Sequence, residues 1–206
     1  LVNLGNTCYM NSALQCLSHI ITFHPNNEHF FNACKRASED SLIYEWFQFQ
    51  RKMWNNESLE SYNPIQLLQR FQRLCIENDL YFSNFSQNDV DEFLTLFLDL
   101  LHRGIKKEVT MNFSTEIEDE SDKISLKSNQ TWKRFYENDY SYIVENFYSQ
   151  LISITSCPEC NYYTTNHDPI QVISLEIPNS ATSLECCLKE YMKKLRLDEN
   201  NMWTCD

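Results

Sequence analysis

The chain has 206 residues, of which 42% are hydrophobic, and this length and composition suit one folded domain with a sizeable core rather than a disordered chain. Its formal net charge of −12 argues against nucleic acid as a partner, because phosphate binding needs an excess of Lys and Arg; the acidity favours a basic partner or simply keeps the protein soluble. Only two glycines occur, which excludes the glycine-rich loops that bind nucleotide phosphates.

No stretch approaches the roughly 20 apolar residues of a membrane span, and the first residues lack the basic and apolar regions of a secretory signal. Nine cysteines, an odd number, occur in a chain too long to need disulfides for stability. We therefore expect an intracellular protein, cytoplasmic or nuclear, that binds no membrane.

The first expected element carries a cysteine at its start. A Gly-Asn-Thr turn leads into Cys8, and the residues after it place apolar side chains at helical spacing. The Cys8 sulfur should therefore lie at a helix N-terminus, where unpaired N–H groups and the helix dipole favour a thiolate. Such a thiolate attacks acyl carbons, and the same N–H groups with the Asn3 amide are suited to hold the oxyanion that forms. A cysteine outside such a motif would usually be a buried packing residue.

Three further helices are expected in the first half of the chain. Residues 42–54 and 64–75 carry apolar side chains at steps of three and four, and Pro64 suits a helix start. The strongest pattern runs from Ser86, the expected N-cap, to about His102.

The beginning of that third helix is acidic. Asp89 and Glu92 are three residues apart, so both carboxylates should share one helical face, with Asp91 adding charge and Gln87 just before them. An arginine could bind there through charge-assisted hydrogen bonds. The simpler alternative is that acidic side chains in a first turn complement the helix dipole.

The second half of the chain is expected to contain strands. Residues 114–129 are polar and charged, which indicates a solvated loop or an insertion, and residues 132–140 return to a helical pattern. Strands are expected over 144–154 and 170–177. Because helices come first and strands later, the expected fold class is α+β.

A CxxC motif follows the first of these strands. Cys157 and Cys160 have the spacing of a zinc knuckle, and Cys205 would begin a second one whose other cysteine lies beyond the last residue given. Two knuckles supply four thiolates to a tetrahedral structural Zn²⁺. A redox CxxC is the alternative, but it needs a helix starting at the motif, whereas residues 161–165 have strand character.

Residues 3–17 resemble the cysteine box of the ubiquitin-specific proteases, a family of papain-like deubiquitinases. In that family the cysteine is the nucleophile, and the asparagine five positions before it supplies an oxyanion-hole amide. The resemblance implies these roles for Cys8 and Asn3, and it makes ubiquitin or ubiquitinated proteins the expected partners.

Residues 87–94, QNDVDEFL, resemble a second signature of the family, in which acidic residues bind the basic C-terminal tail of ubiquitin. The match is imperfect, because Asn88 and Asp91 stand where the family has glutamines. The resemblance implies tail binding by Asp89 and Glu92, with Gln87 and Asp91 beside them.

The resemblance covers most of the chain and implies one partial catalytic domain: a helical thumb over about 1–113, an acidic loop or insertion over about 114–129, and palm and fingers over about 130–206. The fingers would carry a zinc ribbon, and the C-terminal palm strands would be missing. The family's catalytic histidine and its Asp or Asn partner lie in a block after the ribbon, which no histidine of this chain fits. We therefore expect a deubiquitinase that cuts after the C-terminal glycine of ubiquitin, with this span alone inactive or nearly so. The alternative is a non-catalytic relative that binds ubiquitin.

Overall fold

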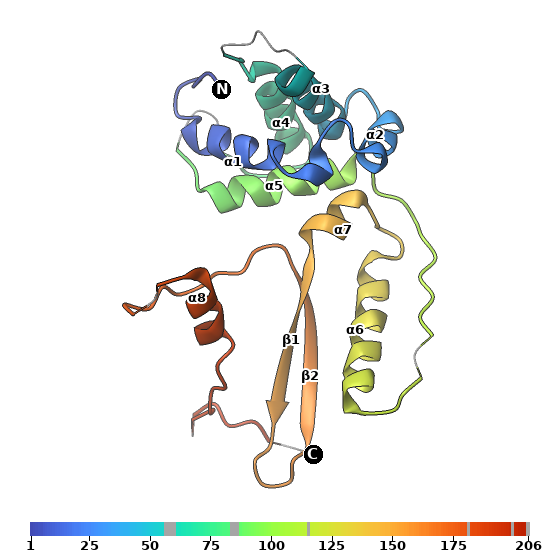
Figure 1. Cartoon of the computed structure of the whole chain (residues 1–206), viewed down its shortest axis with the longest axis vertical. Helices are drawn as coiled ribbons and strands as arrows, with labels where there is room; N and C mark the ends of the chain where they lie inside the picture. Colours follow the sequence, from blue (N-terminus) through green and yellow to red (C-terminus); the bar gives the residue numbers. More distant parts are fainter. Residues whose placement is uncertain (56–60, 83–86, 115, 181, 199, 205–206) are drawn as a thin grey trace. The chain divides into compact units, whose positions relative to one another are not determined.

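The computed structural model describes residues 1–55, 61–82, 87–114, 116–180, 182–198 and 200–204. The described part of the chain combines helices with one antiparallel pair of strands (Figure 1). In chain order the elements are α1 (Cys8–Ser18), the 3₁₀ helix η1 (Ile21–Phe23), α2 (Glu28–Lys35), α3 (Leu42–Asn55), α4 (Ile65–Glu77), α5 (Val90–Arg103), α6 (Glu120–Tyr136), α7 (Tyr142–Phe147), β1 (Ser149–Ser156), β2 (Tyr163–Ile170) and α8 (Leu184–Tyr191). The mixture of helix and sheet agrees with the expected fold class.

The chain divides into two compact units. Unit 1 comprises Leu1–Ser114 and Trp132–Tyr148, and unit 2 comprises Thr115–Thr131 and Ser149–Asp206. None of the described helices is long and apolar enough to cross a lipid bilayer.

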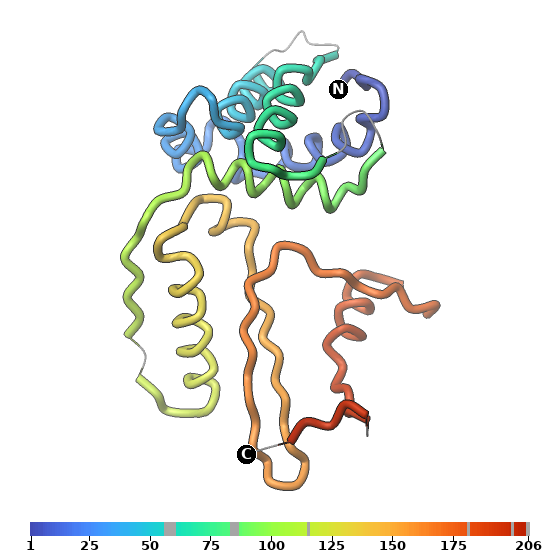
Figure 2. The backbone as a smooth tube through the Cα atoms, turned by 180° about the vertical axis from the view of Figure 1, so that it is seen from behind, coloured from blue at the N-terminus to red at the C-terminus, as the bar shows by residue number. Residues whose placement is uncertain are grey.

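Unit 1 is a helical cluster with an aromatic core. Helix α5 lies against α1, α3, α4 and α7, as both views of the backbone show (Figures 1 and 2). The fully buried indole of Trp46 stacks on Phe49 at 5.1 Å between ring centroids and meets Phe97 edge-on at 5.5 Å. Phe71 of α4 packs edge-on against Phe93 of α5 at 5.3 Å. Burying these large rings, together with the aliphatic side chains around them, stabilises the unit through the hydrophobic effect.

The helices expected over 42–54 and 64–75 are confirmed as α3 and α4. The third expected helix is also present, but it begins at Val90, and Asp89, not Ser86, occupies the N-cap position with an extended backbone (φ −73°, ψ 144°). Ser86 lies outside the described residues.

Unit 2 contains a two-stranded hairpin. Strands β1 and β2 pair antiparallel, with Ser149 opposite Ile170 at one end and Ser156 opposite Tyr163 at the other. From α6, the Lys127 ammonium donates hydrogen bonds to the backbone oxygen of Thr165 at 2.6 Å and to its hydroxyl at 2.9 Å.

Residues 114–129 were expected to form a solvated loop or an insertion. The loop prediction is wrong for most of that range, because α6 begins at Glu120. The helix is started by two aspartates that cap each other. The Asp119 carboxylate accepts from the Asp122 backbone N–H at 3.0 Å, and the Asp122 carboxylate accepts from the Asp119 N–H at 3.2 Å. This reciprocal pairing is the pattern of a capping box, which a reading of composition alone overlooks.

Two strand predictions also need correction. The first strand was expected from residue 144, but the chain there forms α7, because the Ser141 hydroxyl caps that helix, and β1 begins only at Ser149. The strand expected over 170–177 is not formed, since β2 ends at Ile170 and the described residues provide no partner strand beyond it. An extended segment needs such a hydrogen-bonded neighbour to become a strand.

Candidate active site

The predicted start of the first helix is confirmed, since α1 begins at Cys8, whose thiol is exposed. Thr7 occupies the N-cap position and accepts the backbone hydrogen bond of Asn11 at 2.9 Å. Gly5, in the turn before it, has a φ of +108°, and no atom lies within 4 Å of where a Cβ would stand. Glycine is therefore needed here for the backbone conformation and not for space.

The side chain of Asn3 is held by Thr7. Its Oδ1 accepts a hydrogen bond from the Thr7 hydroxyl at 3.0 Å and another from the Thr7 backbone N–H at 3.2 Å. The Thr7 hydroxyl in turn accepts from the Leu4 backbone N–H at 3.0 Å. Because both bonds to Asn3 use its carbonyl oxygen, its NH₂ group faces away from Thr7 as a donor at the exposed surface.

The segment before Cys8 is tied to the rest of unit 1 by backbone contacts. The Val2 N–H donates to the Tyr62 carbonyl at 2.9 Å, and the Asn11 side chain donates to the Val2 carbonyl at 3.1 Å. The turn that carries Asn3 is thereby joined to α1 and to the chain just before α4.

The two sequence motifs meet at Tyr9, the residue after the cysteine. Asn88 donates a hydrogen bond to the Tyr9 hydroxyl at 3.1 Å, and the Tyr9 ring packs edge-on against Phe93 at 5.9 Å. Burial raises the pKa of Tyr9 against the opposing effect of the Asn88 hydrogen bond, and the charges of Glu92 and Cys8 raise it further. The cysteine and the acidic start of α5 therefore share one neighbourhood.

The four side chains expected to bind a basic tail are exposed, and no ion pair in the described part of the chain involves them. Asp89 is the N-cap of α5, Asp91 and Glu92 lie in its first turn, and Gln87 precedes it. The negative charge of the three carboxylates, Asp89, Asp91 and Glu92, is thus available to a cation from outside the chain.

Asn3 was predicted from the sequence, but its partner Thr7 and the Asn88 bridge were not. The preference of threonine for helix N-caps is a signal for Thr7. The Asn88–Tyr9 bond joins residues 79 apart in the sequence, and no local pattern marks such a pair.

No histidine in the part of the chain described above makes a hydrogen bond to Cys8. His102 instead lies buried against unit 1's second segment, with Nδ1 2.8 Å from the Ser141 hydroxyl and Nε2 3.5 Å from the Asp139 carboxylate. Ser141 is 1% exposed, and its hydroxyl already accepts hydrogen bonds from two backbone N–H groups, so this trio is a structural network and not a hydrolytic one. Burial raises the pKa of Asp139, but the Lys106 hydrogen bond and the charges of His102 and Lys106 outweigh it, so that pKa lies below its ordinary value.

The CxxC motif occupies the turn between β1 and β2. The Cys157 N–H donates to the Tyr162 carbonyl at 2.8 Å, the Asn161 N–H donates to the Cys157 carbonyl at 3.1 Å, and Asn161 has a φ of +58°. The Trp203 ring stacks on Tyr162 at 6.0 Å, which brings the end of the described chain beside this turn. Within the described ranges no group of three or more His, Cys, Asp or Glu side chains forms a metal-binding arrangement, and Cys205 lies outside those ranges.

Three other thiols have pKa values that differ from that of an ordinary cysteine. Burial raises the pKa of Cys34 to about 12 and that of Cys75 to about 11, so both are unreactive packing residues. Hydrogen bonds from Ser183 and Thr182 at the start of α8 lower the pKa of Cys186 to about 7.

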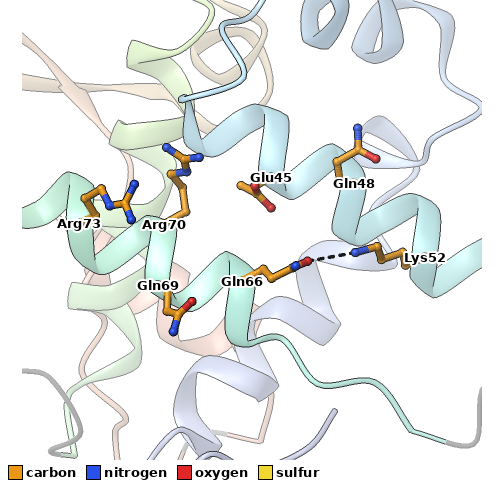
Figure 3. A pocket seen from close by; sticks show the side chains of 7 residues that line it. All are labelled: Glu45, Gln48, Lys52, Gln66, Gln69, Arg70 and Arg73. Carbon is orange, nitrogen blue, oxygen red and sulfur yellow. Dashed lines mark hydrogen bonds between the residues drawn. The ribbon is translucent and has the colours of Figure 1, made fainter.

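A hollow of about 280 Å³ lies between α3 and α4 (Figure 3). Three of its polar side chains have partners: Lys52 donates to Gln66 at 3.1 Å, and Arg70 forms an ion pair with Asp40 at 3.0 Å. None of its lining residues belongs to the motifs above. They are Glu45, Gln48, Lys52, Gln66, Gln69, Arg70 and Arg73.

Residues 1–201 match the model of the family described as "Ubiquitin carboxyl-terminal hydrolase". The chain is 30% identical over 210 residues to ubiquitin carboxyl-terminal hydrolase Usp2 of Drosophila melanogaster, covering 98% of this chain and 21% of that protein. It is 28% identical over 221 residues to ubiquitin carboxyl-terminal hydrolase 4 of Saccharomyces cerevisiae, covering 100% of this chain and 24% of that protein. The chain therefore spans only about a fifth to a quarter of the length of these relatives.

Among solved structures, the chain is similar to one in the SAGA Ubp8/Sgf11/Sus1/Sgf73 DUB module bound to ubiquitin aldehyde. The TM-score is 0.63 at 24% identity, and the match covers 97% of this chain and 39% of the other, so this likeness establishes the fold alone. The family match over almost the whole chain, together with the cysteine at the start of α1, leads to one conclusion: the chain belongs to the ubiquitin carboxyl-terminal hydrolase family.

Proposed function

We propose that this chain is the nucleophile-bearing part of a thiol-dependent deubiquitinase, which hydrolyses the peptide or isopeptide bond after the C-terminal glycine of ubiquitin. The observation that carries the proposal is the meeting of three features in unit 1: the Cys8 thiol at the start of α1, the Asn3 amide held by Thr7, the residue before Cys8, and the acidic start of α5 packed on the same helix. The family membership supports it, and so does the ubiquitin aldehyde bound to the structural neighbour.

In the proposed reaction, Cys8 Sγ attacks the glycine carbonyl carbon and forms a C–S bond, while the carbonyl π electrons move onto oxygen. The Asn3 NH₂ group and backbone N–H groups at the start of α1 stabilise that oxyanion. The tetrahedral intermediate collapses, the C–N bond breaks, and the amine leaves with a proton. Water then hydrolyses the thioester, which releases the ubiquitin carboxylate and restores the thiol. A histidine base from outside this span would accept and return the proton, so we propose that the span alone is inactive.

The acidic start of α5 would bind the basic tail that leads to the scissile bond. Asp89 and Glu92 are exposed carboxylates without an ion pair among the described residues, and Asp91 and Gln87 stand beside them. Charge-assisted hydrogen bonds from an arginine would fix the direction of the tail toward Cys8. The contact between α1 and α5 supports this arrangement.

We further propose a structural Zn²⁺ held by Cys157, Cys160 and Cys205 with a fourth ligand beyond this span. The fit is supported by the tight turn around Cys157. It is also supported by Trp203, which is two residues before Cys205 in the sequence and stacks on Tyr162 in that turn. The ion would close the hairpin tip and take no part in the hydrolysis.

The test uses the longest natural protein that carries this span, incubated with ubiquitin bearing a C-terminal electrophile and followed by intact mass. An adduct that is absent in Cys8→Ala is the expected result, because it requires both tail recognition and a reactive Cys8. A protein that binds ubiquitin without forming the adduct would instead support the second candidate, a non-catalytic ubiquitin-binding module. The observation that favours this candidate is that the described histidines make no hydrogen bond to Cys8.

A further inference from the structure

We propose that Thr7 is a positioning residue for the oxyanion site: its hydroxyl fixes the orientation of the Asn3 amide so that the NH₂ group of Asn3 faces the reacting carbonyl. This proposal rests on the proposed function. It assigns a role to a residue that is neither the nucleophile nor one of the residues proposed to bind the oxyanion or the ubiquitin tail. Thr7 itself would touch neither the substrate nor the reacting atoms.

The burial and contacts of Thr7 support this role. Thr7 is only 4% exposed, although its hydroxyl neighbours an exposed cysteine and an exposed asparagine. The hydroxyl donates to Asn3 Oδ1 at 3.0 Å and accepts from the Leu4 N–H at 3.0 Å, so both its proton and a lone pair are used inside the turn. The two hydrogen bonds offset the free-energy cost of removing this hydroxyl from water, and they hold the Asn3 side chain and the Leu4 backbone in place.

The orientation of the amide matters because an asparagine side chain has two chemically different ends. Rotating it by 180° exchanges a carbonyl acceptor for an NH₂ donor. Only the NH₂ end stabilises an oxyanion, whereas a carbonyl oxygen in its place would repel the developing charge. The two donors of Thr7, its hydroxyl and its backbone N–H, both select the orientation in which Oδ1 points toward α1.

Removal of the Thr7 hydroxyl alone should therefore weaken the preference of the Asn3 amide for this orientation without abolishing it, because the Thr7 backbone N–H remains. Thr7→Val keeps the shape of the side chain and the backbone N–H but loses the O–H donor and the acceptor for Leu4. Loss of a whole oxyanion donor lowers kcat by about 10²–10³-fold. We expect a smaller loss for Thr7→Val, about tenfold in kcat, with KM within twofold of the wild type.

The experiment measures kcat and KM of the natural full-length protein on ubiquitin with a C-terminal fluorogenic amide. Thr7→Val, Thr7→Ser, Asn3→Ala and the Asn3→Ala/Thr7→Val double variant are compared. Thr7→Ser should restore kcat, because serine supplies the same O–H. In the double variant, Thr7→Val should cause no loss beyond that of Asn3→Ala, because a positioning residue acts only through its partner.

A matched reaction separates positioning of the oxyanion site from an effect on the thiol. Alkylation of Cys8 by iodoacetamide breaks a C–I bond at a methylene carbon and forms no oxyanion, so its rate, followed by peptide mass, should be the same in Thr7→Val and the wild type. Slower alkylation of Cys8 would show that Thr7 acts on the nucleophile and would overturn the proposal. Wild-type kcat in Thr7→Val, a further tenfold loss in the double variant, or no recovery in Thr7→Ser would each overturn it as well.

A second readout does not depend on catalysis. NMR relaxation of the Asn3 side-chain NH₂ should show a rigid group in the wild type and Thr7→Ser and a mobile one in Thr7→Val. An equally rigid group in Thr7→Val would overturn the positioning role. A wild-type protein that cleaves no ubiquitin substrate but shows the NMR difference would instead count against the proposed function alone.

Discussion

Replacing Ser141 by alanine should destabilise unit 1 far more than an ordinary surface serine does. The Ser141 hydroxyl makes three bonds at once: it accepts from the backbone N–H groups of Ile143 at 3.1 Å and Val144 at 3.2 Å, and it pairs with His102 Nδ1 at 2.8 Å. It is 1% exposed, so water cannot replace any of these partners. Ser141 therefore caps α7 and links that cap to the end of α5.

The expected loss in the free energy of unfolding follows from two lost interactions, the helix cap and the hydrogen bond to His102. Loss of a serine N-cap costs about 1 kcal/mol. Leaving a buried ring nitrogen of His102 without its partner costs about 1–3 kcal/mol more. The sum, about 2–4 kcal/mol, is a large share of the roughly 5–15 kcal/mol by which a domain is stable.

The assay is urea unfolding of Ser141→Ala, followed by circular dichroism, with Ser38→Ala as the matched control. Ser38 is exposed and its hydroxyl accepts one hydrogen bond, from the Asp40 N–H, so its loss should cost less than about 0.5 kcal/mol. In a His102→Leu background, Ser141→Ala should cost only the cap, about 1 kcal/mol. A loss below about 0.5 kcal/mol in Ser141→Ala, or an equal loss in both backgrounds, would refute the reasoning.

Three other outcomes are expected. The pKa of Asp139 is lower in the folded state than in the unfolded state. The ionised carboxylate therefore stabilises the fold fully above the ordinary carboxyl pKa, and this stabilisation is lost as the pH falls through the pKa of the folded state. The free energy of unfolding, measured from about pH 5 to pH 3, should fall more steeply for the wild type than for Asp139→Asn. At pH 7.5, peptide mapping after brief iodoacetamide treatment should find Cys186 modified well before Cys34 and Cys75, and unfolding in urea should abolish this order. Elemental analysis of the natural full-length protein should find about one zinc per chain, lost in Cys157→Ser; an unchanged zinc content would refute the knuckle.

Much of the helical unit could be predicted from the sequence because each of its main helices buries one apolar face. Residues such as Trp46 and Phe97 recur at helical spacing and become the core, so periodicity alone locates α3, α4 and α5. The start of α6 depended instead on two aspartates that cap each other, and α7 on a single serine. These short-range hydrogen bonds override composition and strand propensity.

The candidate site was predictable to the same extent. The turn-to-helix pattern located Cys8 at a helix start, and the structure bears this out. What no pattern could provide is the side-chain geometry, such as the orientation of Asn3 by Thr7 or the bond between Asn88 and Tyr9. The first of these contacts lies within one turn, but its hydrogen-bond geometry is seen only in the folded backbone. The second joins residues 79 apart in the sequence, so it depends on how distant segments pack.

The division of unit 1 into two sequence segments has a consequence during protein synthesis. Phe23, from the first segment, is fully buried and stacks at 4.8 Å on Phe147, from the second, and the Tyr142 hydroxyl donates to the Thr22 carbonyl at 2.9 Å. At about 5–20 residues per second, a ribosome needs roughly 6–25 s to add the residues that separate the two phenylalanines. Throughout that interval the nascent helices lack the segment that completes their core, and chaperones that recognise exposed aromatic side chains would have their main opportunity to bind.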